Sequence, residues 1–449
     1  MSKPSISKPI LLFVLATVFY INTLQSAIAN WNHVSYMQAD NNLAPFAEFN
    51  VREMLKVNLH PSINVLLEWD KPNDNATWRY QVINKKLVNA GTFTGTHDLG
   101  ANPIQELIDM VKWAKALTLT KYNALRWCIN LWNHGYGILD PRHKGINRTA
   151  PGQTGERHLP WLMIPGMPYG KGDFRGILFD DSQNTYVTAA GLTRAIKGMR
   201  DVIGNKIDII SMDACLMAMI EVGYQINGLA DMLVASENSE PGNGHHYAAY
   251  LTDLSANPSM NAEQLATSIV GTYGRFYAGK DSAITLSAIK IDALIPLKNN
   301  LMQLMAAINA CYTADATSTR AAVRQARAKT MAFDIPDYID LLSFYNRLNT
   351  EFTTKATKAK PKQKPKPKPN QKPVQFSTAL STAATNVRTI IAAGIPLIRA
   401  AVVANTVGRD YAGAGGISIY FPPGPVDASY QTTQFAQDTG WDKFIAKYR

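Results

Sequence analysis

The chain has 449 residues, of which 46% are hydrophobic and 18% charged. This composition excludes an intrinsically disordered chain and predicts a globular protein with a sizeable core. The formal net charge of +11 is local, because two lysines lie near the N-terminus and eight lie between Lys355 and Lys372. The remaining body is close to neutral, so a nucleic-acid partner is not expected.

The N-terminus has the features of an export signal. Lys3 and Lys8 precede the apolar run 10–21, and Ala27-Ile28-Ala29 follows as a small-residue cleavage site. This order predicts a signal peptide over residues 1–29 and a secreted or periplasmic mature protein. The apolar run is shorter than the ~20 residues that a spanning helix needs. We expect no transmembrane segment in the mature chain.

Short apolar runs alternate with helical patterns along most of the chain. Several of the runs are continuously apolar, which is typical of parallel strands covered on both faces. The alternation predicts an α/β sandwich of three layers, with a mostly parallel sheet and helices on both faces. The expected strands are 34–37, 63–69, 125–132, 207–212, 232–235, 284–291 and 416–421, and the expected helices are 43–57, 104–116, 190–202, 216–226, 262–276, 294–310 and 336–348.

Residues 355–373 interrupt this pattern with repeated lysine and proline. Proline removes backbone donors and the lysines repel one another, so we expect a disordered linker or loop. It divides one domain into a main part, 30–354, and a C-terminal part, 374–449, whose late strand at 416–421 is expected in the same sheet. The segment can also make weak contact with anionic surfaces. A second irregular stretch runs from 139 to 181.

The chain has three cysteines, too few for a disulfide framework in an exported protein. Cys128 lies inside an apolar run and Cys311 closes a helical pattern, so both are expected to be buried structural thiols. Cys215 follows the apolar run 207–212 and precedes a helical pattern, and His134 follows the apolar run 125–132. Both reactive side chains therefore lie just beyond the carboxyl ends of strands, where open α/β sheets bind ligands.

A thiol and an imidazole in one cleft have a definite chemistry. The imidazole of His134 can help ionise Cys215 and later protonate a leaving amine. A helix beginning at Cys215 would favour the thiolate through its dipole. The backbone amides of Gly135 and Cys215 are candidate donors to the oxyanion of a tetrahedral intermediate. The residues thus predict a nucleophilic Cys–His pair.

The two motifs are His134-Gly135-Tyr136-Gly137 and Asp213-Ala214-Cys215-Leu216-Met217. In this order, after two apolar strands, they resemble the clostripain family of cysteine peptidases. The resemblance extends to the Asp40-Asn41-Asn42 turn and to the Ser236–Gly242 loop. It implies the caspase-like α/β fold shared with gingipains, legumains and caspases, a protein or peptide substrate, and catalytic roles for His134 and Cys215.

The resemblance further implies that Asp213 lines the primary specificity pocket and that the peptide is cut after Arg or Lys. The acidic turn common in relatives is replaced by Gly244-His245-His246, so Glu237 and Glu240 are further candidate substrate-binding residues. Calcium is a cofactor that the resemblance suggests, and self-cleavage within 139–181 is expected. No resident metal site is predicted, and the two histidines are interpreted as loop residues.

Two other functions remain open at this stage. The chain can be a non-catalytic secreted protein that binds anionic surfaces through 355–373, or a transferase or amidase on the same scaffold. A binding protein has no reason to keep both His134 and Cys215 at strand ends, which favours the peptidase. The sequence does not indicate an oligomeric state.

Overall fold

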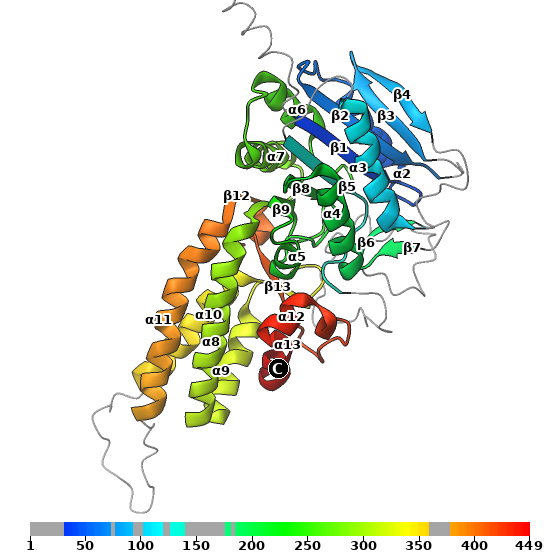
Figure 1. The fold of residues 1–449 in the computed structure, drawn as a ribbon. Helices are drawn as coiled ribbons and strands as arrows, with labels where there is room; N and C mark the ends of the chain where they lie inside the picture. Colours follow the sequence, from blue (N-terminus) through cyan, green and yellow to red (C-terminus); the bar gives the residue numbers. More distant parts are fainter. Residues whose placement is uncertain are drawn as a thin grey trace, which may run out of the picture.

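A computed structural model describes residues 31–72, 77–92, 102–119, 126–139, 176–180, 185–358 and 378–449 (Figure 1). The predicted signal peptide lies outside these residues, as do 140–175 and 181–184 of the irregular stretch. Its remaining part includes the strand β6, Ile177–Asp180, which pairs with β7, Thr185–Val187. The stretch expected to be irregular therefore contains one short strand near its end.

The centre of the molecule is a nine-stranded sheet in the order β12-β10-β9-β8-β5-β1-β2-β3-β4. The five strands β9, β8, β5, β1 and β2 are parallel to one another, and the two strands at each edge are antiparallel to their neighbours. The sheet is thus mixed, and mostly parallel only at its centre. Its strands are β1 Trp31–Gln38, β2 Ile63–Asp70, β3 Trp78–Ile83, β4 Lys86–Thr92, β5 Arg126–Trp132, β8 Ile207–Asp213, β9 Ala230–Ala235, β10 Thr285–Lys290 and β12 Val402–Val407.

Helices cover both faces of this sheet (Figure 1). On one face, α2 Ala44–Met54, α6 Tyr247–Ala256 and α7 Ala262–Tyr277 pack into one apolar core. On the other face, α3 Pro103–Leu119, α4 Ala189–Ile203 and α5 Ile220–Gln225 pack into a second core. Two cores separated by a sheet buried on both sides make the three predicted layers, because each continuously apolar strand needs cover on both faces.

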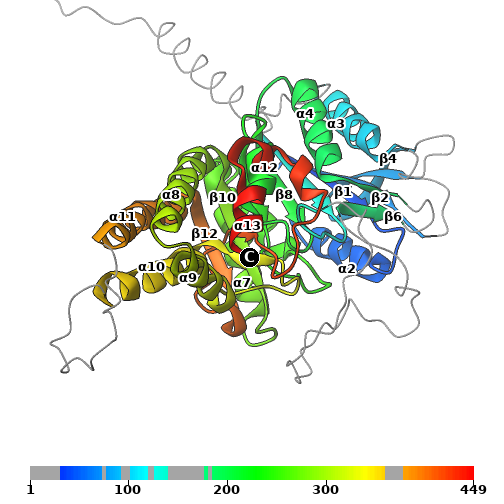
Figure 2. The ribbon, with the colours of Figure 1, turned by 90° about the horizontal axis from the view of Figure 1, so that it is seen from below.

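Four long helices extend from the sheet as a bundle (Figures 1 and 2). They are α8 Leu294–Ala314, α9 Ala316–Lys329, α10 Leu341–Lys358 and α11 Thr378–Ala401. The Lys/Pro segment connects α10 to α11, and α10 continues through residues 355–358, which we had expected to be irregular. A helix can include them because the first proline of the segment, Pro361, disfavours helix only from the residue before it. Residues 359–377 lie outside the described chain.

The strand expected at 416–421 does not join the large sheet. Within it, β13, Ser418–Tyr420, pairs with β11, Tyr338–Asp340, in a separate two-stranded sheet. The late strand of the large sheet is instead β12, directly after α11. The chain ends in α12 Gln434–Thr439 and α13 Trp441–Tyr448, and short 3₁₀ turns cover Ile291–Ala293, Arg409–Tyr411 and Tyr430–Thr432.

A buried carboxylate connects α5 to this C-terminal part. Glu221 is fully buried and accepts hydrogen bonds from the Tyr420 amide and the Tyr430 hydroxyl, both at 2.9 Å. Burial raises the pKa of Glu221 to about 7, from an ordinary value of 4.5. The folded state therefore prefers the protonated carboxyl, and its stability falls as the pH rises from 4.5 through 7.

Replacing Glu221 with Gln should flatten this part of the pH profile. The amide keeps an oxygen acceptor but does not ionise, so the variant should gain up to roughly 3 kcal/mol over the wild type between pH 5 and 7.5, because tenfold in proton affinity is about 1.4 kcal/mol. Urea unfolding at both pH values measures the difference. Glu48→Gln removes a charge from an exposed side chain and is the control. Parallel profiles for wild type and Glu221→Gln would contradict the expectation.

Among the described residues, no helix combines the length and apolar character that a membrane crossing requires.

Candidate active site

The sheet brings the two predicted motifs together. Strands β5 and β8 are parallel neighbours, and Trp132 pairs with Asp213 at their carboxyl ends. The Asn133 amide continues the pairing by donating to the Asp213 carbonyl at 3.3 Å. His134 and Cys215 each lie two residues beyond this last pair, so they leave the sheet at the same level. Both side chains line one small pocket.

Gly135 allows the two strand ends to touch. A Cβ atom at this position would lie 2.5 Å from the carbonyl oxygen of Cys215 and 3.1 Å from the Cβ of Ala214. Backbone at that distance cannot be displaced cheaply, so only glycine fits without moving one of the loops. The two residues predicted to form the oxyanion hole, Gly135 and Cys215, are therefore in direct contact.

His134 is fixed from two sides. Its Nε2 lies 2.7 Å from Oδ1 of Asn42, in the turn after β1, and its own carbonyl accepts from the Leu178 amide at 3.3 Å. Asn133 ties the same loop to β6, since it donates to and accepts from the backbone of Phe179 at 2.8 and 3.0 Å. Burial lowers the pKa of His134 to about 4. At neutral pH the imidazole is uncharged, as a proton acceptor must be.

Asn42 was not singled out as a site residue from sequence. It belongs to the Asp40-Asn41-Asn42 turn, which the family resemblance did identify. A turn at the end of a strand that neighbours β5 was the available signal, but only the folded chain shows that its amide oxygen reaches the imidazole.

Cys215 is 5% exposed, and its Sγ accepts a hydrogen bond from the Glu240 amide at 3.2 Å. Burial and the negative charges around it, first that of Glu240, raise the pKa of the thiol well above its ordinary value. The structure does not supply the helix dipole that we expected, because α5 begins only at Ile220. Leu216 has φ of 66°, which a right-handed helix cannot contain.

The residues between Cys215 and α5 run alongside the loop after β9 instead. The Leu216 amide donates to the Asn238 carbonyl at 3.0 Å, and the Ala218 amide donates to the Ser236 carbonyl at 2.9 Å. These two bonds engage backbone amides with a different loop, which explains why the predicted helix 216–226 is shortened to Ile220–Gln225.

Two of the three predicted substrate-binding residues line the pocket with Cys215. Asp213 lies at the end of β8, and Glu240 lies in the loop after β9. Glu237 does not line it, so our prediction for this residue is not supported by its position. Its Oε2 accepts from the Gly416 amide at 3.0 Å, and burial and the nearby Asp340 carboxylate raise its pKa well above the ordinary value. Glu237 thus connects β9 to the C-terminal part.

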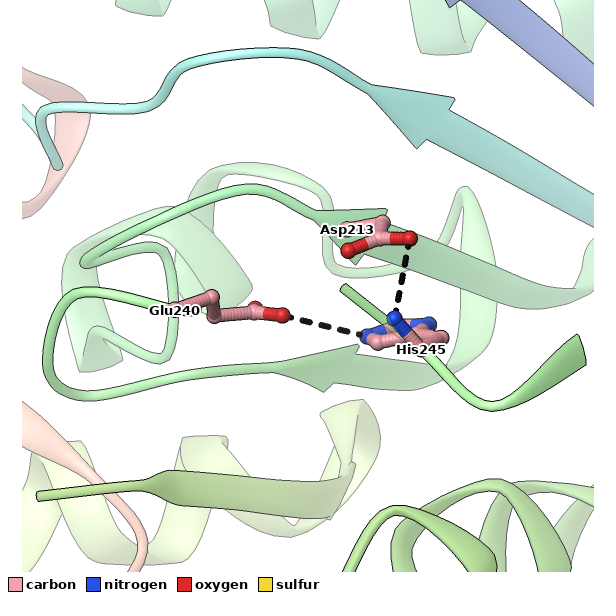
Figure 3. A group of neighbouring side chains, drawn as sticks. All are labelled: Asp213, Glu240 and His245. Atoms are coloured by element: carbon pink, nitrogen blue, oxygen red, sulfur yellow. Dashed lines mark hydrogen bonds and ion pairs between the residues drawn. The ribbon is translucent and has the colours of Figure 1, made fainter. Parts of the chain in front are cut away.

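His245 lies next to two residues that line the pocket, although sequence reasoning interpreted it only as a loop residue. It lies beside Asp213 and Glu240 (Figure 3), with Nε2 of its ring 3.6 Å from the Glu240 carboxylate and its backbone amide donating to Asp213 Oδ2 at 3.1 Å. His246 points elsewhere and lies 3.2 Å from Glu53. The paired histidines therefore have different environments. Neither lines the pocket, but His245 lies beside Asp213 and Glu240, which do.

The other two thiols are buried as predicted. Cys128 on β5 and Cys311 on α8 have no exposed surface, and no disulfide joins any of the three cysteines. Burial raises the pKa of Cys311 to about 11. Neither thiol lines the pocket.

A group of three carboxylates lies beside Gln38, whose Oε1 accepts from the Asn133 side chain at 3.2 Å. Oxygen atoms of Asp40, Asp70 and Asp180 lie within 4.8 Å of one another, and Gln38 Nε2 donates to Asp70 and Asp180 at 2.9 Å each. An all-oxygen set is the kind that calcium takes, so these residues fit the ion that the family resemblance suggests. Calcium binding stays a prediction.

A thiol and an imidazole at the ends of adjacent parallel strands of an α/β sandwich define a class, the cysteine peptidases with this architecture. The model of the clostripain family, peptidase family C11, matches residues 167–448. The chain therefore belongs to the clostripain family and is a cysteine peptidase, a hydrolase that acts on proteins. The matched region contains Cys215 but begins after His134. No curated protein sequence matches the chain.

Solved structures agree on the fold. A secreted C11 cysteine protease of Bacteroides thetaiotaomicron, iotapain, has 14% identity and a TM-score of 0.59, covering 94% of this chain and 100% of its own. A structure of a secreted C11 protease from the same organism with an irreversible peptide inhibitor has 16% identity and a TM-score of 0.57, covering 92% and 99%. An inactive zymogen C11 protease of Parabacteroides distasonis has 16% identity and a TM-score of 0.52, covering 92% and 98%. These likenesses confirm the caspase-like α/β fold.

Proposed function

We propose that the chain is an exported cysteine endopeptidase in which Cys215 is the nucleophile and His134 is the acid–base residue. The observation that carries the proposal is the contact between the ends of β5 and β8, where Gly135 lies against the Cys215 carbonyl. Neither Cys128 nor Cys311 has an imidazole in such a position relative to a pocket. Export is supported by the predicted signal peptide.

The proposed reaction has two stages. His134 takes the proton of the Cys215 thiol, and the thiolate attacks the peptide carbonyl while the Gly135 and Cys215 amides receive the oxyanion. The imidazolium then protonates the leaving amine, which leaves a thioester on Cys215. His134 next takes a proton from water, the resulting hydroxide displaces the thiolate, and the carboxylic product departs.

Asn42 orients the imidazole in this scheme. Its Oδ1, 2.7 Å from Nε2, accepts the Nε2 proton and so leaves Nδ1 to exchange protons with the thiol and amine. Asn42→Ala should lower kcat about tenfold or more with little change in KM, while Asn42→Asp, which keeps an acceptor oxygen, should retain more activity. Steady-state kinetics of the two variants measure this, and equal kcat values would contradict the orienting role.

We further propose that the intact chain is a latent form that cuts itself within 139–181. The pocket beside Cys215 has room for about 20 Å³, roughly one water molecule, which is too little for a peptide side chain. The His134 loop is hydrogen-bonded to β6, through the Tyr136 amide and Gly176 carbonyl at 2.9 Å. A cut before β6 would free this strand at one end and allow the adjoining loop to move.

The opened pocket is proposed to take Arg or Lys as the residue before the cut. Asp213 and Glu240 supply two carboxylates at its wall, and a basic side chain would pair with them. They stand in for the acidic turn that the sequence lacks.

Cleavage of peptides that differ only at this position tests the specificity. Processed wild type and Glu240→Gln are compared under reducing conditions, with and without calcium, on substrates with Arg, Lys or Gln before the cut. Glu240→Gln should lower kcat/KM for Arg and Lys about tenfold or more and leave the value for Gln nearly unchanged. Equal losses on all three would contradict a basic specificity, and cleavage by Cys215→Ala protein would contradict the nucleophile.

A further inference from the structure

Two side chains that line the pocket, together with a third side chain beside them, have the composition of a metal site. Asp213 comes from the end of β8, Glu240 from the loop after β9 and His245 from the residues before α6 (Figure 3). One potential ligand atom from each lies within 4.8 Å of the others. All three residues are buried.

The imidazole of His245 lacks the partners that a buried polar ring normally has. The residue is 1% exposed, and neither ring nitrogen has a hydrogen-bond partner in the part of the chain that the structure describes. The 3.6 Å between Nε2 and the nearer Glu240 oxygen is too long for a hydrogen bond. Two ligands that each lie ~2.1 Å from a shared ion are separated by about this distance.

The positions of these groups are fixed by their surroundings. The His245 amide donates to Asp213 Oδ2 at 3.1 Å, and the Tyr247 hydroxyl donates to the same oxygen at 2.6 Å. The Tyr273 ring meets the His245 imidazole edge-on at 6.0 Å. These contacts hold Asp213 and His245 beside Glu240.

We propose that Asp213, Glu240 and His245 bind a divalent transition metal ion of the zinc class. One imidazole and two carboxylates leave a fourth position open, which is the ligand number of an accessible zinc site, while a nitrogen ligand disfavours calcium and magnesium. The adjoining cavity of about 20 Å³ can hold a water molecule at the open position.

The bound ion would also regulate the enzyme, and this part of the proposal rests on the proposed function. The amide of the same Glu240 donates to the Cys215 thiol at 3.2 Å, so the metal would lie beside the nucleophile. It would occupy the carboxylates that are proposed to receive Arg or Lys. Zinc should therefore inhibit competitively against substrates with a basic residue before the cut.

Binding is tested on full-length Cys215→Ala protein, because this change removes self-cleavage and a competing thiolate. Titration with zinc chloride alone in a calorimeter should show one saturable site. His245→Gln in the same background should weaken it tenfold or more, in line with the usual cost of altering a metal site. His246→Gln is the matched control, since His246 lies next in sequence but contacts Glu53, and it should bind as the parent does.

A second variant and a cobalt spectrum distinguish loss of the metal site from misfolding of the variant. Glu240→Gln should also weaken zinc binding, and Co²⁺ in the parent should give the visible absorption bands of a low-coordinate site that disappear in His245→Gln. Circular dichroism compares the folds. Absence of a saturable site, unchanged binding in His245→Gln, or loss of binding in His246→Gln alone would each overturn the proposal.

Inhibition of peptide cleavage by zinc is measured in a separate experiment. These assays use processed protein with Cys215 intact, and each variant's activity is expressed relative to its own activity without zinc. The zinc concentration for half-inhibition should be at least tenfold higher for His245→Gln than for the wild type. Zinc binding in a protein that cleaves no peptide would support the site and contradict the proposed function. Peptide cleavage by a protein that binds no zinc would support the proposed function and contradict the zinc site.

Discussion

Replacing Cys215 with Ala should reduce peptide cleavage by at least about 10³-fold, because no other described thiol lines the pocket and loss of a nucleophile removes the covalent route. The same change should stop self-processing, so that the chain stays in one piece where the wild type gives two fragments. Mass spectrometry of purified proteins and the initial rate on a peptide substrate measure both effects.

The other two cysteines are natural controls for this experiment. Cys128→Ala and Cys311→Ala each remove a fully buried thiol and should cost some stability but leave kcat/KM within severalfold of the wild type. If either of them lost activity as completely as Cys215→Ala while still folded, the assignment of the nucleophile would be wrong. Fragmentation of Cys215→Ala protein would show that another protease makes the cut.

Replacing Gly135 with Ala should also have a large effect, for a steric reason. The added Cβ would lie 2.5 Å from the Cys215 carbonyl oxygen, so one of the two strand ends must move. A displacement of about 1 Å between reacting groups can lower kcat/KM about 10²-fold. We expect such a loss, with a destabilisation of about 1–3 kcal/mol, measured by peptide kinetics and by urea unfolding.

Gly424→Ala is the matched control. A Cβ at Gly424 would meet no atom within 4 Å, and its φ is outside the left-handed range, so activity and stability should be nearly unchanged. A Gly135→Ala protein with normal kinetics would mean that the contact between the two loops is not needed for catalysis.

The local order of residues was sufficient to predict much of this molecule. Continuous apolar runs such as 207–212 indicate strands covered on both faces, and that pattern is a property of neighbouring residues. The helices 190–202 and 262–276 were predicted nearly to their ends. They begin with Thr188 and Asn261 as side-chain caps, a signal that is local as well.

The sequence was less informative where hydrogen bonds from distant segments determine the local secondary structure. The expected helix after Cys215 is shortened because the Leu216 and Ala218 amides bond to the loop after β9. The strand at 416–421 pairs with β11, Tyr338–Asp340, and not with the large sheet, although its apolar pattern suits either partner. Propensity cannot distinguish such alternatives, since the deciding hydrogen bonds come from far along the chain.

For the site, local sequence was enough to predict the residues of the proposed chemistry: the thiol of Cys215, the imidazole of His134 and the glycine beside it. Their positions at strand ends also predicted that they share one edge of the sheet. The folded chain was needed to show that Asn42 reaches the imidazole, that Glu237 contacts Gly416, and that His245 lies beside Asp213 and Glu240. These contacts join loops that are far apart in sequence, and their distances depend on how the whole sheet is assembled.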